Sequence, residues 1–245
     1  MLTLLQSADL SILHTLNVWS GNWLFDRLVH YIAGDRLLTG FIFLLPYWYF
    51  WFTPTPAGHE RQDRRRQLLT GLFSGLFAIL IARLMADLLP FRARPMFDHA
   101  SGFAIATLDY DRDDDDFETW SSFPSDTAAF TFALSFALRR ISPRLTWALL
   151  AYAFVVAGVF RDYLGVHYPS DSLVGALVGV VAAMLSTAPP FARPAHTLLR
   201  WEAAKPGVFY PLAFVVTAEM GQMFDNVRRA GHSLHRLLAH VHSGT

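Results

Sequence analysis

Five apolar segments constrain the fold of this chain more than any other feature of its sequence. They are separated by polar turns and cover residues 37–52, 68–89, 127–138, 145–160 and 172–188. At about 1.5 Å per residue, each is slightly short for a hydrocarbon core of about 30 Å, so a span must borrow flanking residues. One such segment could be a buried helix of a soluble protein. Five in one chain predict an all-α, polytopic membrane helix bundle of five to six spans.

Composition supports a membrane protein and excludes two kinds of site. Hydrophobic residues make up 53% of the 245 residues, which is more than an ordinary soluble protein carries. Because cysteine is absent, a disulfide framework and a thiolate metal site are excluded. The start, MLTLLQSADL, lacks the basic stretch of a secretory signal, so we expect the apolar segments to remain in the mature protein.

Basic residues cluster in two of the turns and predict the orientation in the membrane. By the positive-inside rule, turns rich in arginine face the cytoplasm. The segments 90–126 and 161–171 then lie on the opposite, extracytoplasmic side. The basic residues are Arg61, Arg64, Arg65 and Arg66 in the first turn and Arg139, Arg140 and Arg144 in the second.

We expect three parts along the chain. Residues 1–35 form an amphipathic, interfacial N-terminal segment, because Asp26, Arg27 and His30 interrupt its apolar residues. Residues 36–190 form the membrane domain. Residues 191–245 form a C-terminal segment with a further span over 209–224, which Pro211 and Glu219 weaken, and a basic tail. The tail holds His232, His235, His240 and His242.

The extracytoplasmic segments contain most of the polar residues that could carry out chemistry. Residues 161–171 read RDYLGVHYPSD, or R-x5-H-x3-D. A histidine followed four residues later by an aspartate, here His167 and Asp171, can be held in one tautomer with its other nitrogen free to attack. Arg94 and Arg161 offer forked donors for phosphate oxygens, and Arg92 is a further candidate.

The tripeptide Pro-Ser-Asp occurs twice, at 124–126 and 169–171, each time before an apolar segment. For Ser170 we favour an ordinary helix N-cap with an acidic first turn. For Ser125 the same position also exposes backbone N–H groups that could bind an anion. Together with Asp126 and Thr127, which we also count among the phosphate-binding residues, these groups predict a phosphate pocket at the membrane surface.

These blocks resemble the type 2 phosphatidic acid phosphatase family, which shares its fold with the vanadium haloperoxidases. The family pattern is K-x6-R-P, then P-S-G-H, then S-R-x5-H-x3-D, and the resemblance covers roughly residues 67–188. It implies that His167 is the nucleophile that forms a phosphohistidine and that Asp171 orients it. It also implies that Arg94, Arg161 and Ser125 bind the phosphoryl oxygens, with no metal and no cofactor.

Three positions depart from the family pattern. Phe160 replaces a serine, Asp87 replaces the lysine of the first block, and Thr127 replaces the histidine that serves as general acid. Arg83 lies one helical turn before Asp87, and we expect it to neutralise that carboxylate. The alternatives are that Arg83 or Arg92 takes over the role of the lysine, or that Asp87 donates a proton.

The threonine at position 127 bears on the substrate. Loss of a general acid typically costs a factor of about 10²–10⁴ in rate. An alkoxide leaving group needs that proton, whereas a phosphate monoester leaving a pyrophosphate has a pKa near 6 and can depart without it. Asp126, where the general pattern has glycine, is also seen in the undecaprenyl pyrophosphatase branch that this chain resembles. Asp126 could be the acid itself, but a helix N-terminus should lower its pKa.

The sequence therefore predicts a multi-pass lipid phosphatase of the plasma (inner) membrane, with residues 36–190 as its phosphatase-like domain and its active site extracytoplasmic. Its partners are the bilayer and a polyprenyl pyrophosphate or related lipid phosphate, and no nucleic acid. The alternatives are a lipid phosphotransferase that uses the same histidine, and an inactive relative that binds lipid phosphates. We read the acidic run 109–116 as a solvated lid rather than a cation site, and the histidine tail as surface-bound rather than metal-binding.

Overall fold

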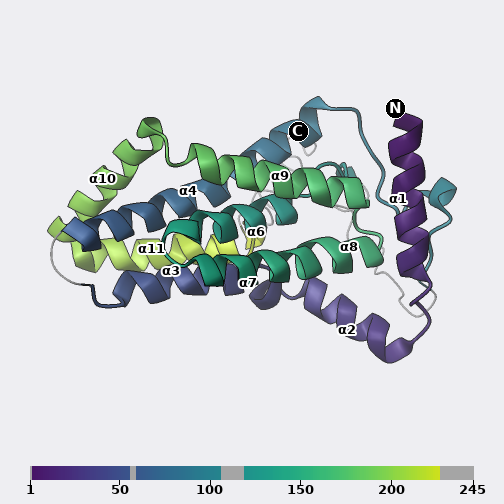
Figure 1. The fold of residues 1–245 in the computed structure, drawn as a ribbon, viewed down its shortest axis with the longest axis horizontal. Coiled ribbons are helices and arrows are strands. Elements are labelled where there is room, and N and C mark those ends of the chain that lie inside the picture. The colour runs from purple at the N-terminus through teal and green to yellow at the C-terminus, as the bar shows by residue number, and fades with distance from the viewer. Residues whose placement is uncertain (1, 56–58, 106–118, 227–245) are drawn as a thin grey trace, which may run out of the picture.

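The computed structural model describes residues 2–55, 59–105 and 119–226, and in these residues it is all helical with no strand (Figure 1). Each predicted apolar segment forms a helix, which confirms the all-α prediction. The π-helical turn η1 (Leu37–Phe41) continues into α3 (Ile42–Phe52), and α7 (Pro143–Ala153) continues through η4 (Phe154–Val159) into α8 (Phe160–Tyr163). The other three are α4 (His59–Leu88), α6 (Asp126–Ala137) and α9 (Pro169–Leu185). The short turns η2 (His99–Ser101) and η3 (Leu138–Arg140) complete the central region.

The predicted number of spans is not confirmed. Among the described residues, two helical stretches are long and apolar enough to cross a membrane: His59–Leu88 and the continuous stretch Pro143–Tyr163. A third is added if α2 (Trp23–Gly34) and the helix Leu37–Phe52 form one span, bent by 59°. At 12 and 17 residues, α6 and α9 are shorter than the about 20 residues of a typical bilayer-spanning helix.

Helix α6 lies at the centre of the bundle and packs against α4, α7 and α9. Its contact with α9 depends on the absence of a side chain at Gly175, where a Cβ atom would lie only 2.2 Å from the carbonyl oxygen of Ser125. The two backbones therefore touch where both helices begin. This contact brings the two Pro-Ser-Asp turns, which are 45 residues apart in the sequence, to one end of the bundle.

The basic turns and the predicted catalytic residues lie at opposite ends of the bundle. Arg83, near the end of α4, pairs with Asp126 at the start of α6, so these helices run antiparallel. At the other end, Arg139 and Gln67 line the same small cavity. This arrangement agrees with the predicted orientation; which side is cytoplasmic remains a prediction.

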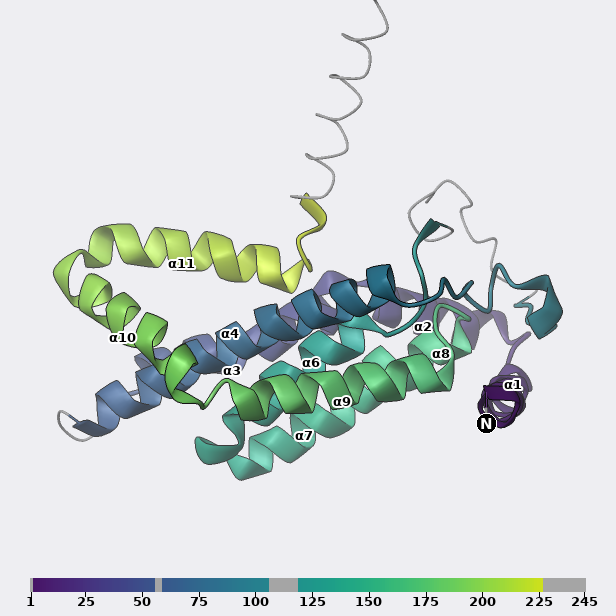
Figure 2. The same ribbon diagram turned by 90° about the horizontal axis from the view of Figure 1, so that it is seen from above.

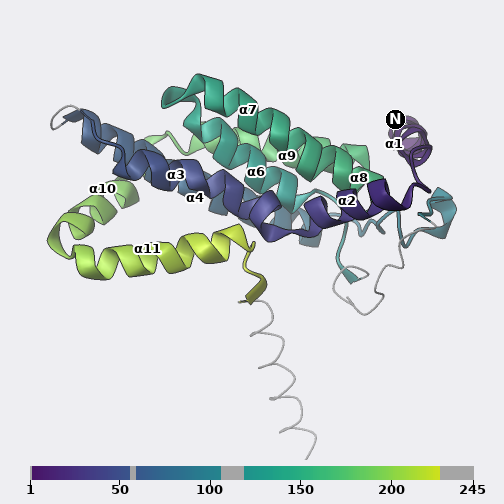
Figure 3. The same cartoon turned by 90° about the horizontal axis from the view of Figure 1, so that it is seen from below.

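The terminal segments extend the bundle at both ends. Helix α1 (Leu2–Asn17) lies crosswise to the bundle helices at the end where α9 begins (Figure 1). At the other end, α10 (Pro189–Ala204) packs on α4, and α11 (Pro206–Gly221) returns along α3 to η1 (Figures 2 and 3). The further span predicted over 209–224 coincides with α11, a helix of 16 residues. The acidic run 109–116 and the four tail histidines lie outside the described residues.

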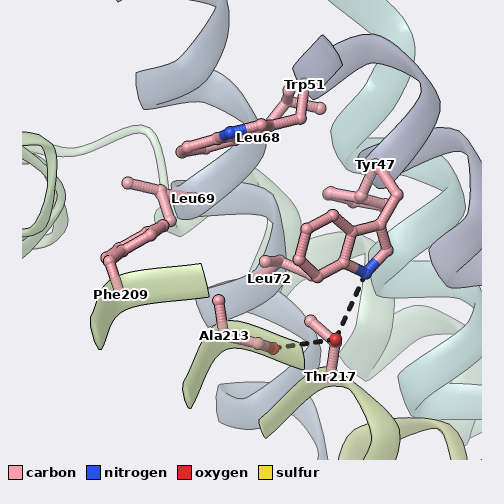
Figure 4. A pocket seen from close by; sticks show the side chains of 9 residues that line it. Tyr47, Trp51, Leu68, Leu69, Leu72, Phe209, Ala213 and Thr217 are labelled. Atoms are coloured by element: carbon pink, nitrogen blue, oxygen red, sulfur yellow. Dashed lines mark hydrogen bonds between the residues drawn. The ribbon is translucent and has the colours of Figure 1, made fainter. Parts of the chain in front are cut away.

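A small pocket separates α11 from α3 and α4 (Figure 4). Its lining is mainly apolar and aromatic, and a hydrogen bond from Trp48 Nε1 to Thr217 Oγ1 at 3.2 Å joins two of its walls. The pocket leaves about 40 Å³ for water-sized occupants, which is room for only a few water molecules. It is therefore too small, in this conformation, to hold a lipid chain.

Candidate active site

His167 is the central residue of the site, and the structure gives its two ring nitrogens different surroundings. The side chain is buried in the loop between α8 and α9. Nδ1 lies 2.8 Å from the carbonyl oxygen of Ser122, to which it can only donate. Nε2 is buried and has no hydrogen-bond partner among the described residues. The neutral tautomer with its proton on Nδ1 therefore directs a free lone pair from Nε2 into the site.

The partner of Nδ1 differs from our prediction. We expected Asp171 to hold the imidazole, but its nearest carboxylate oxygen lies 4.0 Å from Nδ1, beyond hydrogen-bond distance. Asp171 instead accepts the backbone N–H of Tyr168 at 2.9 Å and a hydrogen bond from the Arg92 guanidinium. Its charge is near enough to act on the ring electrostatically.

The loop that carries His167 is folded tightly onto the first sequence block. Gly165 adopts a φ of 68°, and its carbonyl accepts the backbone N–H of Met96 at 3.0 Å. Arg94 Nη1 donates to the carbonyl of Val166 at 2.9 Å. Two blocks about 70 residues apart are thereby joined directly beside the histidine.

Two buried arginines set the charge around His167. Burial lowers the pKa of Arg94 to about 10, so it stays charged at neutral pH. Arg161 is also buried, and its Nε has no hydrogen-bond partner in the described part of the chain. Burial, together with the charges of Arg94 and Arg161, lowers the pKa of His167 well below its usual value. The imidazole is therefore neutral and lies within the field of two cations, which is a suitable arrangement for an anionic electrophile.

The start of α6 forms another side of the site. Ser125 is the predicted N-cap, and its hydroxyl accepts the backbone N–H of Ala128 at 3.3 Å. Its own N–H donates to the carbonyl of Asp171 at 3.1 Å. Thr127, in the position of the family's general acid, is buried, with its hydroxyl 3.4 Å from the sulfur of Met223.

The expected pairing of Arg83 with Asp87 is wrong. Arg83 forms an ion pair with Asp126, and Asp87 is exposed. Burial alone would raise the pKa of Asp126, but the charges of Arg83 and then Arg161 outweigh it and lower the pKa below its usual range. Asp126 is therefore a carboxylate near neutral pH, which argues against it as a general acid. Through its ion pair with Asp126, Arg83 places a positive charge from α4 beside the site.

Arg92 lies at the edge of the site, with its guanidinium held by three side chains. It donates to Ser170 Oγ at 2.8 Å and to the Asp9 carboxylate at 2.7 Å, besides its bond to Asp171. It also lies 4.0 Å over the ring of Tyr168. That Arg92 binds phosphate remains a prediction. In the structure its guanidinium donors are occupied by these side chains.

Sequence reasoning missed two groups that the structure places next to the predicted residues. The carbonyl of Ser122 could not have been found, because a backbone acceptor leaves no mark in the sequence. Asp9 did leave a signal, since it is the only acidic residue in the first 25. Among the described residues, no three His, Asp or Glu side chains are close enough together to hold a metal ion.

Comparison with known proteins gives matches to a superfamily, to segments of two bacterial proteins and to a crystal structure. The sequence model of the PAP2 superfamily matches residues 67–194. The bacitracin transport permease protein BcrC of Bacillus licheniformis is 41% identical over 64 residues, and the proposed undecaprenyl-diphosphatase YbjG of Escherichia coli K12 is 42% identical over 71 residues. Each match covers 26% of this chain, and this chain spans only 31% and 32% of those two proteins.

The crystal structure of LpxE from Aquifex aeolicus superposes on this chain with a TM-score of 0.50. The superposition covers 73% of this chain and 93% of LpxE, at 22% sequence identity. At that level of identity the likeness concerns the fold.

Proposed function

Because the chain belongs to the PAP2 superfamily, we propose that it is an integral-membrane lipid phosphatase that hydrolyses a polyprenyl pyrophosphate. The reaction proceeds through a phosphohistidine on His167. The site faces the extracytoplasmic side of the inner membrane, opposite the basic turns. The name of YbjG refers to an undecaprenyl diphosphate, which supports this substrate class.

The observation that carries the proposal is the state of His167 Nε2. It is buried, unprotonated in the favoured tautomer, and without a partner among the described residues. A buried polar atom without a partner is costly, and a ligand that binds there or a role in the reaction is one explanation for it. The unpartnered Nε of Arg161 nearby supplies a cation for the same ligand. Together they favour a phosphate group between the two side chains.

In the first step, Nε2 attacks the terminal phosphorus and forms a P–N bond. The P–O bond to the lipid phosphate breaks, and its electron pair leaves with that phosphate. The imidazole keeps its proton on Nδ1 and becomes a cation, which the carbonyl of Ser122 and the carboxylate of Asp171 at 4.0 Å stabilise. Water then attacks the phosphohistidine, the P–N bond breaks, and its electrons return to Nε2 as inorganic phosphate leaves.

The environment of Thr127 favours a pyrophosphate over a monoester. A threonine hydroxyl cannot protonate an alkoxide near neutral pH, and Asp126 is held ionised by Arg83. A lipid monophosphate leaves without a proton, because its own pKa is near 6. The charges of Arg94, Arg161 and Arg83 all act on Asp126 beside the site, and charge stabilisation is the main requirement of phosphoryl transfer.

The test is release of inorganic phosphate by the purified protein in detergent, from farnesyl pyrophosphate and from phosphatidic acid side by side. His167→Ala is the inactive variant. His59→Ala, an exposed histidine at the opposite end of α4, is the matched control. We expect release from the pyrophosphate, loss of that release in His167→Ala only, and at least about 100-fold slower turnover of phosphatidic acid.

Equal turnover of the two substrates would contradict the leaving-group argument. Release that survives in His167→Ala would exclude the phosphohistidine. No release from either substrate would favour the phosphotransferase or the inactive relative.

A further inference from the structure

We propose that Asp9, in the N-terminal helix, is a positioning residue that acts on His167 through Arg92 and Asp171. Asp9 lies outside the superfamily match, which begins at residue 67. The inference rests on the proposed function, because the effect is on the nucleophile of that reaction.

Asp9 makes three hydrogen bonds to the catalytic end of the bundle. One carboxylate oxygen accepts the backbone N–H of Ser170 at 2.9 Å. The other accepts the Ser170 hydroxyl at 2.7 Å and Arg92 Nη2 at 2.7 Å. The side chain is only 5% exposed although α1 crosses the end of the bundle (Figure 1). A buried carboxylate with this many donors is fixed in position.

Arg92 carries the effect from Asp9 to the catalytic carboxylate. Its Nη2 is held by Asp9, and its Nη1 donates to Asp171. A guanidinium is planar and rigid, so fixing one nitrogen fixes the direction of the other. Stacking over the ring of Tyr168 at 4.0 Å restricts it further. Together with the backbone N–H of Tyr168, Asp9 thus helps to fix, through Arg92, where the Asp171 carboxylate lies relative to His167 Nδ1.

The charges give this arrangement a role in the reaction. One guanidinium is shared by two carboxylates, so the group Asp9–Arg92–Asp171 carries one net negative charge. Without Asp9, Arg92 would neutralise Asp171 alone, and the charge that faces the imidazolium of the intermediate would be cancelled. Asp9 also fixes the start of α9 by accepting the N–H of Ser170. Because the hydrogen bonds of the Asp9 side chain go to Arg92 and Ser170, we expect its loss to change kcat more than KM.

The test is a double-mutant cycle of Asp9→Asn and Arg92→Gln, with phosphate release from farnesyl pyrophosphate measured per mole of folded protein. We expect each single variant to lower kcat by about 10-fold to 100-fold, which is the size of effect that small misplacements in an active site produce. KM should change by less than about 3-fold. The kcat of the double variant should be no lower than that of the slower single variant, because both changes remove the same Asp9–Arg92 interaction.

Asp26→Asn is the matched control, because Asp26 is also a buried carboxylate of the N-terminal segment but bonds to Tyr163 and Gly21. It should lower the thermal midpoint, and its effect on kcat should be additive with Arg92→Gln. If Asp9→Asn yields no folded protein, the cycle is run with Asp9→Glu, which keeps the charge but displaces it, and the same non-additivity is expected.

Additive effects of the Asp9 and Arg92 variants, or an unchanged kcat in a folded Asp9 variant, would overturn the inference while the proposed function stands. If the wild-type protein releases no phosphate, the proposed function fails and the inference fails with it.

Discussion

The tight turn at Gly165 offers a direct test of how the His167 loop is held. Gly165→Ala adds one methyl group at a φ of 68°, where an L-residue is strained by about 1–2 kcal/mol. The new Cβ would lie 2.3, 2.7 and 2.8 Å from three ring carbons of Phe103. The closest is about 1 Å short of an ordinary contact, and such overpacking typically costs about 1–3 kcal/mol. The two effects together predict a loss of about 2–5 kcal/mol in the free energy of unfolding.

Phe103→Ala separates the two effects, because it removes the ring without changing the backbone strain. In that background Gly165→Ala should cost only the strain of about 1–2 kcal/mol. Unfolding in mixed detergent micelles would measure all four proteins. Since the carbonyl of Gly165 anchors Met96, and Val166 anchors Arg94, a shift of about 1 Å should also lower phosphate release by roughly 100-fold in the single variant. Equal costs of Gly165→Ala in both backgrounds would refute the steric part of the reasoning.

Three further predictions concern the chemistry of the site. Neutral His167 is the attacking form and its pKa is lowered, so the fall of kcat/KM towards acid pH should occur below pH 6.5. Arg94→Gln removes a positive charge that lowers this pKa, so in that variant the fall should occur at a higher pH. An acid limb above pH 6.5 in the wild type would contradict the burial argument. Arg83→Gln should lower kcat/KM at least about 10-fold, because Asp126 loses its ion-pair partner. Asp87→Asn changes an exposed carboxylate and should leave kcat/KM within about 3-fold of the wild type. A larger loss in Asp87→Asn than in Arg83→Gln would favour Asp87 as the proton donor. Thr127→His should improve turnover of phosphatidic acid by about 10-fold or more, but only when it is combined with Met223→Ala. The Met223 sulfur lies 3.4 Å from the Thr127 hydroxyl and would occupy the space of the imidazole. Improvement in the single variant would mean that the sulfur does not block the histidine.

The sequence by itself predicted the helices and the residues of the candidate site. Apolar runs of helical length form helices wherever a bundle can cover them, and a Ser or Asp before such a run can cap it, as Ser125 does for α6. The same prediction for Ser170 is wrong, because α9 already begins at Pro169 and its N-cap is Tyr168. These are local properties, so they can be read from neighbouring residues. The blocks around Arg94, Ser125 and His167 were identified in the same way, and the structure brings them to one end of the bundle. The number of spans was less certain, because several helices are shorter than the bilayer is thick.

Only the tertiary structure decided how the members of the site are paired. The carbonyl of Ser122, 45 residues from His167, takes the hydrogen bond that sequence spacing assigned to Asp171. Arg83 faces Asp126, 43 residues away, rather than the aspartate one turn along its own helix. Asp9 reaches Ser170 across 161 residues. A hydrogen bond is lost over a displacement of less than 1 Å, and distances of that size are set by how whole helices pack, through contacts such as Gly175 against Ser125.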